Sequence, residues 1–200
     1  VETPAHPTNA LIDLQAMKAE LDAFAARHGY RPISVCDNTL LGPIFQKPAE
    51  HGVDLCVYSL TKYVGGHSDL VAGAVTGSKD LIKKVRAIRS AFGSQLDPHS
   101  CWMITRSMET VVLRMKQAAR SATRVAQWLA GNPHEKVRIY HPETIADEAY
   151  QAVYKRQCTG PGSTFAFVLD GGRAKAFRFI NALRLFKSAV SLGGTESLVC

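Results

Sequence analysis

Apolar residues recur along the chain with two different periods, and each period predicts a different kind of element. Compact apolar runs at residues 33–36, 55–60 and 70–76 contain β-branched side chains and predict buried strands. Apolar positions three or four residues apart predict a helix before these strands and a second, basic-faced helix after them. These positions are Leu11, Leu14, Met17, Leu21 and Phe24 in the first helix and Leu81, Ile82, Val85 and Ile88 in the second.

Punctuating residues predict where the helices begin and end. Asn9 is expected to cap the first helix, because its side chain accepts hydrogen bonds from free backbone N–H groups, and Gly29 is expected to stop it. A short helix is expected around residues 45–51. Asp97 and Pro98 open a long helical region. The sustained apolar face of that region comprises Val111, Val112, Met115, Ala118, Ala119, Ala122, Val125, Ala126 and Leu129.

The last quarter of the chain alternates strands and helices. A strand is expected at residues 137–140, a helix near 146–156, a strand at 163–169 and a helix at 173–185. This β-α-β-α order suits a small α/β domain. We therefore expect an α/β protein without internal repeats.

Composition adds few constraints. The chain has 200 residues, of which 46% are hydrophobic and 20% charged, so it is long enough to bury a core as one large domain or one domain plus part of another. The net charge of +7 comes from basic residues spread along helices, which indicates solvated helix faces. Nucleic-acid binding would rest on that charge alone and would have to weaken steeply with salt. We therefore expect no nucleic-acid partner. We also expect no membrane partner, because no signal peptide and no long apolar span is present.

Cysteines and histidines show no metal-site spacing. Five cysteines are an odd number without a Cys-x-x-Cys pair, and Cys36 and Cys56 lie inside apolar strands, which is typical of reduced, buried thiols in a cytoplasmic protein. Seven histidines are scattered without a pair at ligand spacing, so no metal is predicted.

Candidate chemistry gathers where the second apolar run ends. Ser59, Thr61 and Lys62 follow that strand, and Gly65 and Gly66 then force a turn. A partly desolvated lysine presents a neutral amine that attacks a carbonyl carbon as a Schiff-base former, and the obvious carbonyl is that of pyridoxal 5′-phosphate. The hydroxyls of the serine and the threonine would then hydrogen-bond the phosphate.

Asp37 supplies the carboxylate that this cofactor needs against its pyridine nitrogen. It ends the run that starts at Ile33, and a crossover long enough for a helix joins it to the strand before Lys62. Two parallel strands would place both residues at one sheet edge, where ligands bind in open α/β sheets. A strand-end Asp is more often a turn residue, so the residues alone predict only an α/β domain with a candidate Schiff-base lysine.

Four blocks of the sequence together resemble a known family. Residues 2–8, 36–39, 59–69 and 189–198 are similar, in the same order, to blocks of the pyridoxal-phosphate-dependent enzymes of Cys/Met metabolism. That family includes cystathionine γ-synthase, methionine γ-lyase and O-acylhomoserine sulfhydrylase. The resemblance spans almost the whole chain.

The resemblance implies a fold-type I transferase. Residues 1–108 would be part of a large cofactor-binding domain with a mixed, mostly parallel sheet, and residues 109–200 a linking helix and part of a smaller C-terminal α/β domain. The strand at 70–76 would run antiparallel to its neighbours. Family chains are longer, so we expect this one to be a segment that lacks phosphate-binding residues on one side and a substrate-binding arginine on the other.

The resemblance also implies roles for particular residues. Lys62 would hold the cofactor and then move protons as general base and acid, while Asp37 keeps the ring nitrogen protonated. Ser191 would orient the amino-acid substrate near its carboxylate. His6 stands where the family usually has an asparagine beside the ring, and its role stays open between that contact and a turn. For His67 and nearby Asp69, a turn held by side-chain hydrogen bonds is favoured over a catalytic dyad.

The implied reaction is a trans-sulfuration-type step on a γ-substituted amino acid. Residues 189–194 look like the γ-type version of their block, and Val190 replaces a glutamate common in cystathionine-handling members, which favours methionine γ-lyase or O-acylhomoserine sulfhydrylase. Cystathionine β-lyase and a non-catalytic folded segment are the alternatives. The family further implies a cytoplasmic homotetramer, a dimer of dimers with shared active sites.

Overall fold

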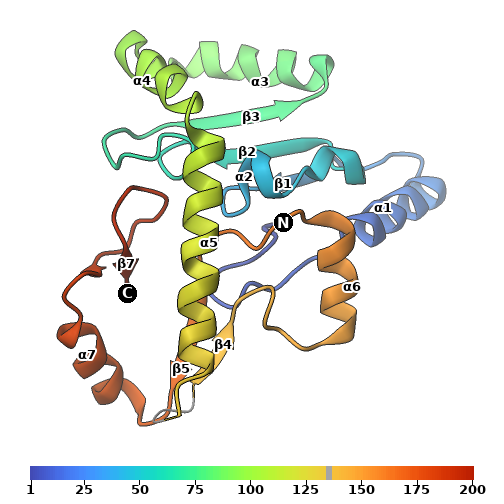
Figure 1. The fold of residues 1–200 in the computed structure, drawn as a ribbon. Coiled ribbons are helices and arrows are strands. Elements are labelled where there is room, and N and C mark those ends of the chain that lie inside the picture. Colours follow the sequence, from blue (N-terminus) through green and yellow to red (C-terminus); the bar gives the residue numbers. More distant parts are fainter. Residues whose placement is uncertain (134–136) are drawn as a thin grey trace.

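Helix α5 (Val111–Ala130) stands in the middle of the molecule. The structure is a computed structural model and describes residues 1–133 and 137–200. A three-stranded sheet lies beside one end of α5 and the two-stranded sheet of β4 and β5 beside the other, as Figure 1 shows. No helix in these residues is long and apolar enough to cross a membrane.

The three-stranded sheet has the mixed topology that the family resemblance implied. Its strands are β1 (Val35–Asp37), β2 (Leu55–Ser59) and β3 (Gly73–Gly77), in that order across the sheet. β1 and β2 are parallel and β2 and β3 antiparallel, which confirms both expected pairings. The carboxyl ends of β1 and β2 therefore meet at one edge of the sheet.

Helix α1 (Leu14–His28) begins later than Asn9 predicted, and that prediction of the cap is wrong. The cap is Asp13, whose carboxylate accepts hydrogen bonds from two backbone N–H groups of the first turn. Asn9 instead has a left-handed backbone (φ 55°), and its side-chain amide donates to the distant Tyr140 and Thr164 carbonyls. Gly29 ends α1 with φ 75°, as expected.

The short helix expected around residues 45–51 is in fact two pieces. They are α2 (Gly42–Phe45) and the 3₁₀ helix η1 (Pro48–His51), and Gln46 between them is extended. A proline disfavours helical backbone in the residue before it, so the helix cannot continue through Lys47.

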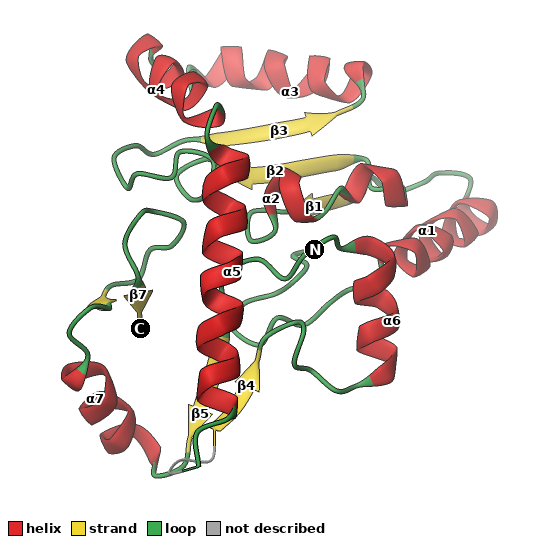
Figure 2. Ribbon diagram, viewed as in Figure 1, coloured by secondary structure: helices red, strands yellow, loops and turns green. Residues whose placement is uncertain are grey.

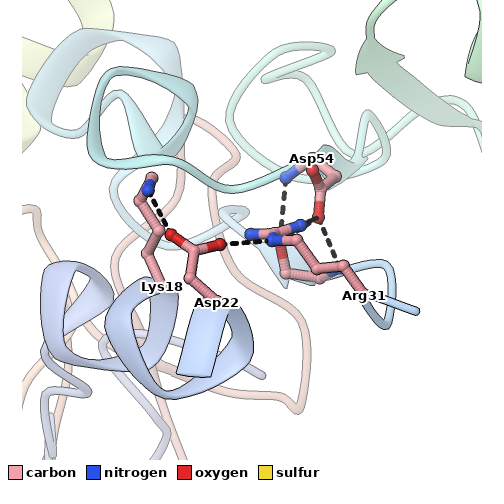
Figure 3. Close-up of polar contacts among 5 residues, drawn as sticks. Lys18, Asp22, Arg31 and Asp54 are labelled. Atoms are coloured by element: carbon pink, nitrogen blue, oxygen red, sulfur yellow. Dashed lines mark hydrogen bonds and ion pairs between the residues drawn. The ribbon is translucent and has the colours of Figure 1, made fainter. Parts of the chain in front are cut away.

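An ion-pair network holds α1 to the strands (Figure 3). The Arg31 guanidinium lies 2.7 Å from a carboxylate oxygen of Asp22 on α1 and 2.7 Å from one of Asp54 before β2. Lys18 also pairs with Asp22, and Ser34 donates to Asp54 from its backbone and its hydroxyl. Burial opposes ionisation of Asp54, but the donors from Ser34 and Arg31 prevail and lower its pKa. The network joins α1 to the chain just before β1 and just before β2.

The long helical region forms two helices. Asp97 caps α4 (Pro98–Met108), and α5 starts after a break at Glu109 and Thr110. Before them, α3 (Lys79–Phe92) is capped by Ser78. Figure 2 shows α3 and α4 as an outer layer beyond β3.

The main core joins both halves of the sequence. It packs one face of α5 against α2, the lysine-bearing loop and α6 (Glu148–Gln157). Its buried members are Leu41, Phe45, Tyr63, Val111, Met115, Ala119, Tyr154 and Cys158. All the apolar positions of α5 that it uses were predicted from their spacing.

The remaining elements follow the expected order. β4 (Val137–Tyr140) pairs antiparallel with β5 (Ala166–Leu169), and α7 (Gly172–Ala182) follows. β4 has the expected bounds, β5 is shorter at its start, α6 begins and ends slightly later, and α7 ends earlier. Two short parallel strands, β6 (Lys187–Ser188) and β7 (Leu198–Val199), enclose the segment that contains Ser191.

The five cysteines are free thiols, but not all of them are buried. Cys36, Cys56 and Cys158 are buried, and burial raises the pKa of Cys36 and of Cys158 to about 12. Cys101 on α4 and Cys200 after β7 are exposed, which corrects the expectation of buried thiols.

Candidate active site

The chain after β2 folds into a compact turn, residues 59–66, which we name the lysine turn. Its backbone N–H groups close it: Lys62 donates to the Ser59 carbonyl at 3.2 Å, Gly65 to Leu60 at 2.8 Å and Gly66 to Lys62 at 2.7 Å. These bonds fix the position of the Lys62 backbone at the carboxyl edge of the sheet.

Ser191 contacts Lys62, although the two residues are 129 positions apart in the sequence. The Lys62 Nζ donates to the Ser191 Oγ at 3.1 Å. The segment around Ser191 approaches this closely because of Gly193, which has φ 83°; an added Cβ there would lie 2.5 Å from the Tyr63 backbone nitrogen. The structure thus brings together the two residues that the family resemblance named for cofactor and substrate.

Asp37 is the last residue of β1 and is half-buried. One carboxylate oxygen accepts the Thr39 backbone N–H at 2.9 Å, and no described residue donates to the other oxygen. The Thr39 hydroxyl in turn accepts the Ser59 backbone N–H at 2.8 Å. Thr39 therefore ties the end of β1 to the start of the lysine turn, a role that the sequence analysis missed although Asp-x-Thr is a turn pattern.

The two hydroxyls expected at the phosphate have different surroundings. The Thr61 hydroxyl accepts the Ala72 N–H at 3.0 Å and donates to the Ala72 carbonyl at 3.4 Å, so it joins the lysine turn to the chain before β3. The Ser59 hydroxyl has no partner among the described residues. Ser59 is therefore the more available donor for a phosphate group.

Tyr63, next to Lys62, is anchored through its hydroxyl. That hydroxyl lies 2.6 Å from the Thr164 Oγ1 and accepts from the Ser163 Oγ at 2.8 Å. Burial raises the pKa of Tyr63, so the phenol stays neutral. No local pattern in the sequence marks this contact, because its partners lie about a hundred positions away.

Two histidines of the sequence analysis, His67 and His6, remain to be placed relative to the lysine turn. His67 hydrogen-bonds across its own turn, with Nδ1 2.7 Å from the Gly65 carbonyl oxygen, as the turn interpretation predicted. His6 is exposed in the opening segment.

The side chains at this edge fit pyridoxal phosphate. An amine, a carboxylate with a free oxygen and an unpaired hydroxyl match an aldehyde, a pyridine nitrogen and a phosphate, the three groups by which the cofactor is held. Two hollows in the described surface lie away from this edge, one beside Lys83 on α3 and one beside Phe179 on α7. The assignment of this site rests on its donor set.

A mixed sheet that presents a lysine and a carboxylate at one edge fits the fold-type I class of pyridoxal-phosphate-dependent enzymes. The sequence model of the Cys/Met metabolism PLP-dependent enzyme family matches residues 1–200. The chain belongs to that family.

Individual relatives agree with the assignment. The chain is 41% identical over 199 residues to an L-methionine γ-lyase of Pseudomonas deceptionensis (98% of this chain, 48% of the relative). It is 37% identical over 202 residues to a cystathionine γ-lyase of Saccharomyces cerevisiae (100% and 50%). A crystal structure of cystathionine γ-synthase from Xanthomonas oryzae pv. oryzae in complex with aminoacrylate and cysteine superposes with a TM-score of 0.88 at 34% identity (99% and 49%). The chain spans about half the length of these relatives.

Proposed function

We propose that the protein is a pyridoxal-phosphate-dependent enzyme that performs γ-elimination or γ-replacement on a γ-substituted amino acid: methionine, cystathionine or an O-acylhomoserine. The observation that carries this proposal is the 3.1 Å contact between the Lys62 amine and Ser191 at the sheet edge that Asp37 shares. The relatives described above are γ-lyases and a γ-synthase, which supports the γ-type chemistry.

Pyridoxal phosphate, when bound, draws electron density away from the substrate Cα and so makes proton loss there possible. Lys62 is the covalent anchor of the cofactor and, once released from it, the base that takes the proton from Cα and returns it to a neighbouring carbon. Its position inside the hydrogen-bonded lysine turn restricts the positions that the amine can reach.

Asp37 holds the proton on the ring nitrogen. A carboxylate favours a cationic partner, and the unpaired oxygen of Asp37 leaves room for one more donor. Ser59 donates to the phosphate. Thr61 contributes by fixing the turn through Ala72, and it donates to the phosphate only if it releases the Ala72 carbonyl.

Ser191 orients the amino-acid substrate. Its hydroxyl accepts from Lys62 and so stands where an incoming substrate carboxylate would arrive beside the amine. The neighbouring Val190 is 91% exposed and offers the leaving group an apolar surface, which favours methionine or an O-acylhomoserine over cystathionine.

The protein is proposed to work in the cytoplasm as a homotetramer, a dimer of dimers with shared sites. Large apolar side chains on the surface of α5 support an assembly, since Leu113 is 70% and Trp128 68% exposed. Sedimentation of the full-length protein tests this: a monomer at micromolar concentration would contradict it.

Product analysis tests the reaction. The full-length protein, loaded with pyridoxal phosphate, is incubated in turn with methionine, cystathionine and O-acylhomoserine, each with and without an added thiol as the nucleophile for γ-replacement, and the keto acid, thiol or thioether products are separated. γ-Type products from at least one substrate are expected. β-Type products alone would favour a cystathionine β-lyase, and no turnover of any substrate would favour a non-catalytic scaffold.

The variant Lys62→Ala tests whether Lys62 is the residue that attaches the cofactor covalently. The wild-type protein should absorb visible light when loaded and keep the cofactor covalently after borohydride reduction, whereas the variant should lose this reducible linkage. Covalent trapping at wild-type levels in Lys62→Ala would show that the anchor is another residue.

A further inference from the structure

Arg114 on α5 reaches into the lysine turn from the outside. Its Nη1 donates to the Tyr63 carbonyl at 2.6 Å and its Nη2 to the Val64 carbonyl at 3.1 Å. The same guanidinium also donates to the Ser107 carbonyl at 2.8 Å and, through Nε, to the Thr110 hydroxyl at 3.1 Å. One side chain therefore bonds the turn, the end of α4 and the start of α5.

No carboxylate pairs with Arg114 in the described part of the chain. Burial lowers the pKa of its guanidinium, so the charge is held at a cost. The carbonyl groups of Tyr63, Val64 and Ser107 reduce that cost, because they accept hydrogen bonds from the buried cation. Ser107 also lies in the last turn of α4, where the backbone dipole is negative. The contact is a cation solvated by backbone, not a surface ion pair.

The lysine turn is shaped around this guanidinium. Gly66 has φ 72°, and an added Cβ would lie 1.8 Å from the Arg114 Nη1, so only glycine allows the approach. Gly66 also donates its N–H to the Lys62 carbonyl. Tyr63 is held at two points, its carbonyl by Arg114 and its hydroxyl by the chain at 163–164. The residue that follows Lys62 thus has almost no freedom to rotate.

We propose that Arg114 is a positioning residue for Lys62: it fixes the carbonyls of the lysine turn and thereby aims the amine at the cofactor aldehyde. Arg114 acts through the turn and touches neither cofactor nor substrate. The proposal rests on the proposed role of Lys62 as the covalent anchor. It assigns to α5, beyond its packing, a part in setting the geometry of the site.

Two cofactor measurements on the full-length protein separate positioning from binding. The first is the rate at which apo-protein captures pyridoxal phosphate in a borohydride-reducible form. The second is the affinity for 4′-deoxypyridoxine 5′-phosphate, which has the ring and phosphate but no aldehyde to react. Arg114→Met should slow capture about tenfold, since misplacing a reacting group by about 1 Å costs up to about 10²-fold. Affinity for the deoxy analogue should stay within about twofold.

Hydrogen–deuterium exchange of the apo-protein gives a readout independent of the cofactor. In Arg114→Met the amides of Gly65 and Gly66 should exchange faster, because the turn that protects them loses its outer anchor. Arg120→Met on the exposed side of α5 is the matched control and should change none of the three measurements.

Milder variants keep the test decisive if Arg114→Met does not fold. Arg114→Lys keeps the charge without the planar fork and should restore part of the capture rate. Thr110→Val removes the acceptor of Nε together with the 3.4 Å hydrogen bond from the Thr110 hydroxyl to the Ser107 carbonyl, and it should slow capture by a smaller factor. A folded Arg114 variant with wild-type capture and exchange would overturn the proposal, whereas absence of capture in the wild type would overturn the role of Lys62 itself.

Discussion

The lysine turn was predicted from two glycines that follow an apolar strand, and helix α3 from an apolar stripe, but the structure holds the two regions in different ways. Lys62 and Tyr63 bond to partners 100 to 129 positions away. Helix α3 is amphipathic yet has no buried residue, and Ile88 and Phe92 on it are 60% and 82% exposed. Figure 2 shows it at the outside of the molecule. An apolar stripe thus indicates which face would be buried, and not whether anything covers it.

The difference concerns function as much as stability. Catalysis needs reacting groups held to a fraction of an ångström, and the partners of the lysine turn come from several elements that cannot all shift together. Helix α3 depends on local features, a Ser78 cap and Gly93 in the left-handed region. The two regions should therefore respond differently to substitution.

The largest effect is expected at the pyridine partner. Asp37→Asn should retain cofactor but lose several orders of magnitude in rate, because a neutral amide cannot keep the ring nitrogen protonated. Steady-state turnover and cofactor absorbance are measured together. Asp170→Asn changes an exposed aspartate that also follows a strand, β5, and should be silent. Near-normal turnover in Asp37→Asn would remove Asp37 from the site.

The second-largest effect is expected on stability, when a side chain of the main core is truncated. Met115 is 2% exposed and packs with Leu41 and Tyr63, so Met115→Ala should lower the free energy of unfolding by about 2–5 kcal/mol. Met108→Ala, at a methionine that is 49% exposed, is the control and should cost much less. Urea unfolding measures both, and equal losses would show that the core does not depend on Met115.

Local patterns predicted the elements of this fold well, and for a physical reason. The parallel β1–β2 pair, the Gly29 stop and the buried face of α5 follow from side-chain period and backbone preference, which are properties of neighbouring residues. Asp37 and Lys62 could be placed at one sheet edge on that basis. Their roles needed the family resemblance, because strand-end Asp and Lys are common.

Long-range contacts are what the sequence could not predict. Asn9 was expected to cap a helix, but its amide bonds chain more than 130 positions away. Thr61 was expected at the phosphate, but it bonds Ala72, and that role stays a prediction. Arg114 resembles any other basic residue of a helix in the sequence, and only packing shows that it faces the lysine turn.

A buried histidine allows a pH-dependent test of how strongly the interior of the protein is packed. His141 lies between the Thr123 hydroxyl and the Glu143 backbone N–H, and burial lowers its pKa to about 4. Well above pH 6.5, the ordinary pKa of histidine, the imidazole is neutral in both the folded and the unfolded state and contributes no pH dependence. As pH falls from about 6.5 towards about 4, only the unfolded state gains the proton, so stability falls by about 1.4 kcal/mol per pH unit.

His141→Gln should lack this slope. Between pH 6.5 and pH 5 the wild-type protein should lose about 1.5 kcal/mol more of its unfolding free energy than the variant does. Urea unfolding at the two pH values checks the difference, with His99→Gln on exposed α4 as the control that keeps the slope. Parallel curves for wild type and His141→Gln would mean that the imidazole takes up a proton without unfolding.

The smallest effect is expected when an exposed apolar side chain of α3 is truncated. A matching truncation in the main core then gives a quantitative comparison of the two regions. Phe92→Ala should change the free energy of unfolding by no more than about 0.5 kcal/mol, because the ring is 82% exposed and loses little contact. Phe45→Ala removes the same ring from the core and should cost about 3–5 kcal/mol. If Phe92→Ala proves nearly as costly as Phe45→Ala in the full-length protein, something covers α3 there. A cost that grows with protein concentration would identify the cover as a second subunit, and a constant cost would identify it as more of the same chain.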